Sequence, residues 1–119
     1  MKYITIILFL TVTVFAQQKL VYVGYIDDEI DLGLAPYISR VISEAEKENA
    51  DAIVFKINTF GGRVDAATQI KDAILQSRIK TVAFINNRAI SAGALIALSC
   101  NAIIIGQLQW QLRLNYPEP

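Results

Sequence analysis

Residues 52–85, AIVFKINTFGGRVDAATQIKDAILQSRIKTVAFI, decide the fold class of this chain. The run starts with Ala52 to Ile57, a short apolar segment rich in branched residues, which is typical of a buried strand. Asn58 to Gly62 ends that strand. From Arg63 the apolar residues recur every three or four positions, which predicts an amphipathic helix, and Thr81 to Ile85 predicts another strand. A strand, a helix and a strand of these lengths indicate parallel neighbours joined by a crossover helix.

The segment before this unit has the same alternation of elements. Lys19 to Ile26 is rich in branched and aromatic residues, which predicts a first strand. Asp27 to Asp31 then forms an acidic linker. Apolar residues at helical spacing from Leu34 to Ala45 predict a first helix, which ends near Asn49.

The segment after the unit continues the series. Asn86 to Arg88 predicts a polar loop, Ser91 to Ser99 a helix of small residues, and Ala102 to Ile105 a fourth strand. The sequence therefore predicts an α/β fold with a parallel sheet.

The two ends of the chain differ from this central part. Residues 1–16 carry one positive charge and then an apolar run too short to span a bilayer, which predicts a signal peptide cleaved before Gln17. An uncleaved anchor or a buried N-terminal strand is the alternative. Residues 17–106 form the domain, and 107–119 make an atypical tail, interpreted either as a polar C-terminal strand and extension or as a truncated or frameshifted end. On the first interpretation of the N-terminus, the protein is exported to an extracytoplasmic or periplasmic location.

Composition excludes several functions. The chain has 11 Lys and Arg, 11 Asp and Glu and no histidine, so it has neither a basic field for nucleic acid nor a histidine for a catalytic triad or metal centre. Cys100 is the single cysteine and its apolar neighbours predict a small buried residue. The acidic residues 27–31 lack the spacing of a calcium loop. We therefore expect no cofactor, no metal and no nucleic-acid partner.

Two strand-to-helix junctions carry the residues with catalytic potential. Gly61 and Gly62 follow the second predicted strand, where ligands bind in open α/β sheets, and bare backbone amides there can stabilise an oxyanion. Ser91 occupies the matching position after the third strand and is followed by Ala92 and Gly93, which leave its hydroxyl accessible. Together they predict half of an acyl-transfer site. The alternatives are ordinary turn glycines and an ordinary helix N-cap serine.

Two sequence motifs resemble those of a known protein family. Residues 57–67, INTFGGRVDAA, and residues 87–97, NRAISAGALIA, resemble the NfeD proteins, which are membrane-bound serine proteases of the ClpP class. The resemblance covers about residues 21–105. It implies an incomplete ClpP/crotonase-like spiral of βαβ units, with Ser91 as nucleophile and with Gly61, Gly62 and Ala92 in the oxyanion-hole region.

The sequence departs from the family pattern at two points. Phe60 stands where many relatives have proline, which alters the rigidity of the turn. The family uses a serine-lysine dyad, but no lysine follows Ser91 here, and Arg113 stays protonated. We interpret Lys56, Lys71 and Lys80 as solvated or strand-edge charges. The general base is thus absent from this chain, which indicates a truncated protease domain.

The resemblance implies a serine endopeptidase that cleaves hydrophobic protein segments, forms a homo-oligomer, and works beside stomatin-like proteins at a membrane. Because the base is missing, we expect this chain to be weakly active or inactive. The alternative is a non-catalytic peptide-binding scaffold domain in a complex with stomatin-like proteins. Crotonase-type thioester chemistry is a third reading, against which the export signal and the surroundings of Ser91 argue.

Overall fold

A computed structural model describes residues 17–106. The predicted signal peptide, residues 1–16, and the predicted atypical tail, residues 107–119, lie outside the described residues. Within residues 17–106, four strands alternate with three helices. In chain order they are β1 Val21–Ile30, α1 Leu34–Lys47, β2 Ala52–Gly62, α2 Val64–Gln76, β3 Thr81–Ala89, α3 Ala92–Ser99 and β4 Ala102–Ile105. Within residues 17–106, no helix is both long and apolar enough to span a bilayer.

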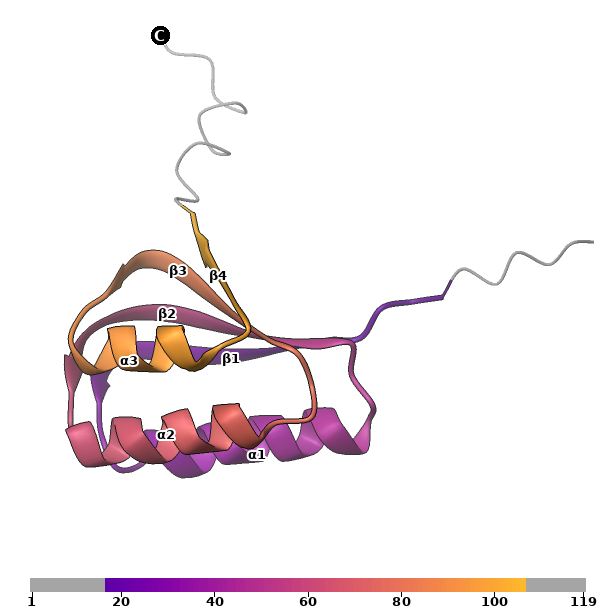
Figure 1. Ribbon diagram of the computed structural model, residues 1–119, viewed down its shortest axis with the longest axis horizontal. Coiled ribbons are helices and arrows are strands. Elements are labelled where there is room, and N and C mark those ends of the chain that lie inside the picture. The colour runs from indigo at the N-terminus through magenta and orange to yellow at the C-terminus, as the bar shows by residue number, and fades with distance from the viewer. Residues whose placement is uncertain (1–16, 107–119) are drawn as a thin grey trace, which may run out of the picture.

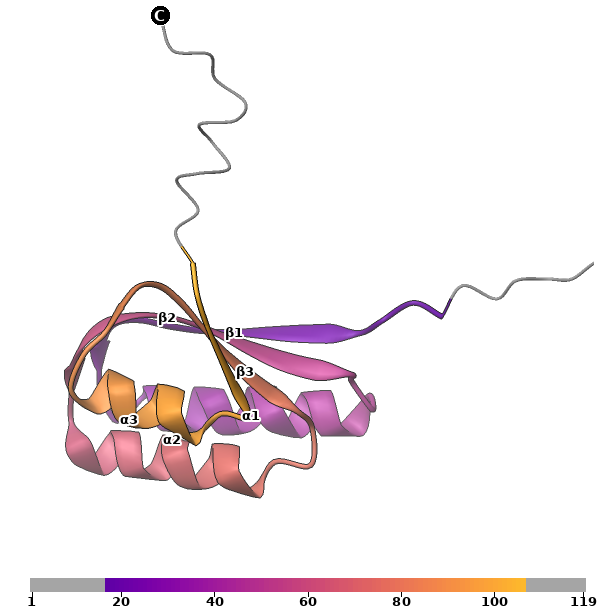
Figure 2. The ribbon, with the colours of Figure 1, turned by 45° about the horizontal axis from the view of Figure 1, so that its top comes forward.

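The strands form one parallel sheet in the order β1-β2-β3-β4. Each strand is therefore placed on the same side of its predecessor. Because crossovers between parallel strands are right-handed, a steady progression in one direction puts every crossover helix on the same face of the sheet. Figures 1 and 2 show α1, α2 and α3 together on one face. The α/β class predicted from the sequence is confirmed.

The core lies between the sheet and these helices. On β2 the odd-numbered residues from Ile53 to Thr59 are buried, while the even-numbered residues are only half-buried. Helix α1 adds Ile38 and Ile42, and α2 adds Ile70 and Ile74. This period of two on the strand and of three to four on the helices is the pattern that the sequence predicted.

Within residues 17–106, no helix covers the opposite face of the sheet. Val23 and Tyr25 on β1 are exposed, at 45% and 51%, and Ile104 on β4 is exposed at 52%. In the ladder Tyr25 pairs with Lys56, Lys56 with Phe84, and Phe84 with Ile104, so these side chains form one row across the sheet. One face is thus packed and the other presents apolar side chains.

Three strands are longer than predicted, and all extend at their carboxyl ends. The acidic residues 27–30 belong to β1, the segment from Asn58 to Gly62 belongs to β2, and Asn86 to Ala89 belongs to β3. The pairing continues through these polar residues, with a register shift between Asp27, which pairs with Asn58, and Glu29, which pairs with Gly61. The ladder joins backbone groups, so it can continue where the side chains turn polar, and the apolar pattern alone could not mark this extension.

Candidate active site

Ser91 lies in a strained turn between β3 and α3. Its backbone has φ 55° and ψ −119°, a positive φ that a non-glycine residue adopts at a cost of about 1–3 kcal/mol. The residue is exposed, and its side chain makes no capping hydrogen bond to the helix. The structure thus lacks the interaction that would make Ser91 an ordinary N-cap. A sharp strand-to-helix turn that presents a free hydroxyl is instead typical of a nucleophile.

The start of α3 provides the nearest backbone donors. Gly93 N donates to Ile90 O and Ala94 N donates to Ser91 O, each at 3.0 Å. Ala92 is the first helical residue, so its N–H has no acceptor one turn earlier within the helix. The amide of Ala92 lies directly after the serine at the positive end of a helix dipole.

The glycine pair fits between the Ser91 turn and β1. A Cβ on Gly61 would lie 3.0 Å from Ile90 O and 3.0 Å from Ser91 Cβ, and Gly61 has φ 117°. A Cβ on Gly62 would overlap the backbone of Ile30, and its φ is 154°. Glycine is required at both positions because backbones approach on either side. The structure therefore brings Gly61, predicted from one junction, next to Ser91 and Ala92 from the other, and places Gly62 against Ile30 of β1.

Thr59 joins these parts, and sequence reasoning did not single it out. The side chain is 1% exposed. Its Oγ1 donates to Asp28 O and accepts from Gly61 N at 3.0 Å, while its carbonyl accepts from Ile90 N at 3.1 Å. A threonine two residues before a glycine was the only available hint, since such hydroxyls bond to nearby backbone.

A groove of about 480 Å³ opens beside the glycines. It is lined by Asp28, Glu29, Phe60, Gly61 and Gly62. Phe60 is 69% exposed, and the Arg88 guanidinium lies 4.2 Å from the centre of its ring. The groove thus offers an aromatic wall and two carboxylates next to bare backbone.

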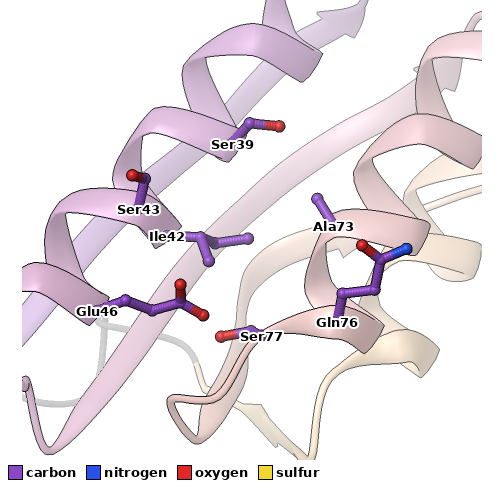
Figure 3. A pocket seen from close by; sticks show the side chains of 7 residues that line it. All are labelled: Ser39, Ile42, Ser43, Glu46, Ala73, Gln76 and Ser77. Atoms are coloured by element: carbon purple, nitrogen blue, oxygen red, sulfur yellow. The ribbon is translucent and has the colours of Figure 1, made fainter.

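Three further features of the described residues lie outside this groove: a second hollow, the single cysteine and the acidic residues. A second hollow of about 230 Å³ lies between α1 and α2 (Figure 3), and its Glu46 accepts from Arg78 N at 2.9 Å. Burial raises the pKa of the Cys100 thiol to about 11, which keeps it protonated and unreactive at neutral pH. Within residues 17–106, no three His, Cys, Asp or Glu residues gather as a metal site.

The lysines considered from the sequence do not converge on Ser91. Lys80 comes directly before the first residue of β3, and Ser91 comes two residues after the last residue of that strand. The two therefore lie at opposite ends of a strand that is about 25–30 Å long. Lys71 pairs with Asp72, Nζ to Oδ1 at 2.9 Å. Lys56 lies three residues before Thr59 on β2, about 10 Å along the strand.

Comparison with solved structures places the fold. The chain is similar to 1510-N, a membrane protease from Pyrococcus horikoshii specific for a stomatin homolog, with a TM-score of 0.68 and 33% identity over 78% of this chain and 51% of that one. A variant of that domain in complex with a substrate peptide gives a TM-score of 0.68. ClpP1 from Listeria monocytogenes gives 0.63 at 25% identity, over 77% of this chain and 64% of that chain. The chain is a protease-type domain of ClpP-like fold.

Comparison of sequences identifies the family. Residues 20–109 match the family described as NfeD1b, N-terminal domain. The chain is 41% identical to the membrane protein NfeD1b of Bacillus subtilis over 88 residues, which are 74% of this chain and 20% of that protein. It is 35% identical to the membrane-bound protease PH1510 of Pyrococcus horikoshii over 101 residues, 82% of this chain and 23% of that protein. The chain belongs to the NfeD1b N-terminal domain family, and it spans about a fifth of the length of these curated relatives.

Proposed function

We propose that this chain carries the nucleophile and oxyanion half of a serine endopeptidase site that hydrolyses peptide bonds in hydrophobic protein segments. The observation that carries the proposal is the Ser91 turn, with φ 55° and no capping bond, packed against Gly61. Of the roles open to a serine at a helix start, only nucleophilic attack uses both a strained backbone and a free hydroxyl.

The reaction has two stages. Ser91 Oγ attacks the substrate carbonyl, its proton passes to a general base, and the tetrahedral intermediate then expels the amine, which takes up that proton. Water attacks the resulting ester in the same way and releases the acid, which restores the serine. In each stage a negative charge develops on the carbonyl oxygen.

The amides of Gly62 and Ala92 are the donors that we assign to this oxyanion. Gly61 N is already bonded to Thr59 Oγ1, so the role of Gly61 is to allow the close approach of the Ser91 turn. Arg63 N donates to Ile30 O of β1 at 2.8 Å. Because successive N–H groups of a strand point to opposite sides, the Gly62 amide points away from β1, toward the side on which Ser91 lies.

The general base that this site needs is a lysine that is not among residues 1–119. Lys80 is the last lysine of the sequence, and a missing base costs an enzyme about 10²- to 10⁴-fold. The 119-residue chain alone is accordingly a poor peptidase.

The relatives and the groove support a proposal for the substrate class and the setting. The exposed Phe60 ring beside the glycines suits an extended apolar peptide, and the archaeal relative is named for specificity toward a stomatin homolog, so we assign the chain a stomatin-like partner. We assign it a membrane-associated location because both curated relatives are named as membrane proteins, and an extracytoplasmic one because residues 1–16 predict a signal peptide. The open apolar sheet face suits a homo-oligomer.

A second candidate is a peptide-binding scaffold domain that does not cut. This function needs no general base, and the groove lined by Phe60, Gly61 and Gly62 is the observation that favours it. It uses the same groove and the same backbone amides, so only turnover separates it from the protease.

Peptidase assays separate the two candidates. The chain is extended with the lysine-bearing downstream part of the archaeal domain, and cleavage of a hydrophobic peptide is followed by mass spectrometry. We expect hydrolysis to rise by about 10²- to 10⁴-fold over the 119-residue chain, and Ser91→Ala to remove the gain because nucleophile and base act as a unit. If the extended chain binds the peptide without cutting it, the scaffold function holds.

A further inference from the structure

Three segments of the site meet at the buried residue Thr59, two at its hydroxyl and one at its backbone carbonyl. The first is the irregularity of β1 between Asp27 and Glu29, where Asp28 has φ 60° and its carbonyl accepts from Thr59 Oγ1. The second is the glycine turn, whose Gly61 N donates to the same oxygen at 3.0 Å. The third is the Ser91 turn, whose Ile90 N donates to Thr59 O at 3.1 Å.

The methyl group of Thr59 makes a fourth contact. A Cβ on Gly93 would lie 2.5 Å from Thr59 Cγ2, so no side chain fits between helix α3 and this methyl group. Thr59 therefore sets the distance between α3 and β2 as well as the direction of the glycine turn. The side chain touches neither the Ser91 hydroxyl nor the groove.

We propose that Thr59 is a positioning residue for the oxyanion hole. The Thr59 hydroxyl accepts from Gly61 N and so sets the orientation of the next amide, that of Gly62. The Thr59 carbonyl, which accepts from Ile90 N, and the Thr59 methyl group, which lies against Gly93, set the position of the Ala92 amide. The inference rests on the proposed function, since it assumes that these two amides receive the oxyanion. It predicts an effect on the charged tetrahedral state and none on ground-state binding.

The test compares two ligands of the 119-residue chain. A hydrophobic peptide boronic acid adds to Ser91: the Oγ–B bond forms, the hydroxyl proton passes to solvent, no bond to boron breaks, and a boronate oxygen takes the oxyanion position. The matching peptide amide binds without adding. We expect Thr59→Val to weaken boronate binding roughly 10- to 100-fold, as small misplacements of catalytic groups do, and to leave amide binding unchanged. Thr59→Ser keeps the hydroxyl but lacks the methyl group against Gly93, so it is expected to bind the boronate more tightly than Thr59→Val.

The matched control is Thr81→Val. Thr81 is also 1% exposed, and its hydroxyl also makes two hydrogen bonds, donating to Asn101 Oδ1 at 3.1 Å and accepting from Asn101 N at 3.2 Å. It lies at the start of β3, the end away from Ser91. We expect Thr81→Val to lower stability as Thr59→Val does, with no change in the ratio of boronate to amide affinity.

A second measurement separates failure of this inference from failure of the proposed function. In amide hydrogen exchange on the unliganded wild-type chain, we expect the Gly61 N–H to be protected, to lose protection in Thr59→Val and to recover it in Thr59→Ser. Equal boronate binding by wild type and Ser91→Ala overturns the proposed function alone. Unprotected Gly61 in wild type, or wild-type boronate affinity in Thr59→Val, overturns the role of Thr59.

Discussion

Close approaches between backbone segments at single residues determine the geometry of the candidate site. Ser91 has its positive φ because the chain turns sharply from β3 into α3, and Gly61 has no side chain because that turn lies against it. Thr59 stays buried because its hydroxyl is bonded to backbone on both sides. Adjacency of Ser91 with the glycines could be predicted from sequence, because the carboxyl ends of parallel strands share one edge of the sheet. The role of Thr59 could not, because its partners Asp28 and Ile90 are 31 residues away on either side.

Substitution of Gly61 tests this packing. In Gly61→Ala the new methyl meets Ile90 O and Ser91 Cβ, each at 3.0 Å, at a φ of 117°. We expect a loss of about 1–3 kcal/mol or more in the free energy of unfolding, measured by urea denaturation. Gly33→Ala is the control, because its nearest atom is Asp31 Oδ1 at 3.3 Å and its φ is negative. A Gly61→Ala variant as stable as Gly33→Ala contradicts the described contact.

At the scale of elements, order and type could be predicted, and strand ends could not. The alternating period of side chains identified each of the seven elements. The sequence predicts a linker at Asp27 to Asp31, a strand end at Asn58 to Gly62 and a loop at Asn86 to Arg88, because these side chains carry no apolar pattern. In the structure these segments extend the strands, and they hold Gly61 and Gly62 and lead to Ser91. Pairing with the neighbouring strand is what makes them strands. The neighbouring strand is known only once the fold is known, so the apolar pattern of the sequence does not mark these strand ends.

Helix α2 gives a prediction at the same scale. The helix has no side-chain N-cap, but Asp65 in its first turn accepts from Arg63 at 2.7 Å and from Ala66 N at 2.9 Å. The hydrogen bond from Arg63 is the main cause that lowers the pKa of Asp65 from 3.8 to about 2. A carboxyl with a lowered folded-state pKa adds stability above its unfolded pKa and loses it as the pH falls through the folded value.

We therefore expect wild type to have a larger free energy of unfolding than Asp65→Asn at neutral pH, and this difference to shrink between about pH 4 and pH 2. The measurement is the urea midpoint of both proteins across that range. Arg63→Gln is the partner variant and is expected to shift the loss toward higher pH. A difference that is constant from pH 7 to pH 2 contradicts the assigned interaction.

At the scale of the whole molecule, one face of the sheet is left uncovered by the part of the chain that the structure describes. All three helices lie on the other face (Figure 2), and Val23, Tyr25 and Ile104 are about half exposed on this one. Contiguous exposed apolar surface on a soluble chain marks an interaction surface.

We expect the 119-residue chain to self-associate with rising concentration, as seen by sedimentation velocity. Val23→Lys, on the edge strand β1 of this face, is expected to weaken the association with little change in unfolding, because the side chain is 45% exposed. Lys71→Ala on α2 is the control at the helical layer. A chain that stays monomeric, or an association that Val23→Lys leaves unchanged, contradicts this use of the open face.

The central claim is that Ser91 is the nucleophile, and one measurement tests it directly. The 119-residue chain is incubated with the p-nitrophenyl ester of a hydrophobic peptide, whose phenolate leaves easily, so that acylation depends little on the missing base. After acid quenching, peptide mapping locates the acyl group. The account predicts one acyl group on Ser91 Oγ and none in Ser91→Ala. An acyl group on another residue such as Ser99, or no acyl group on Ser91, would contradict it.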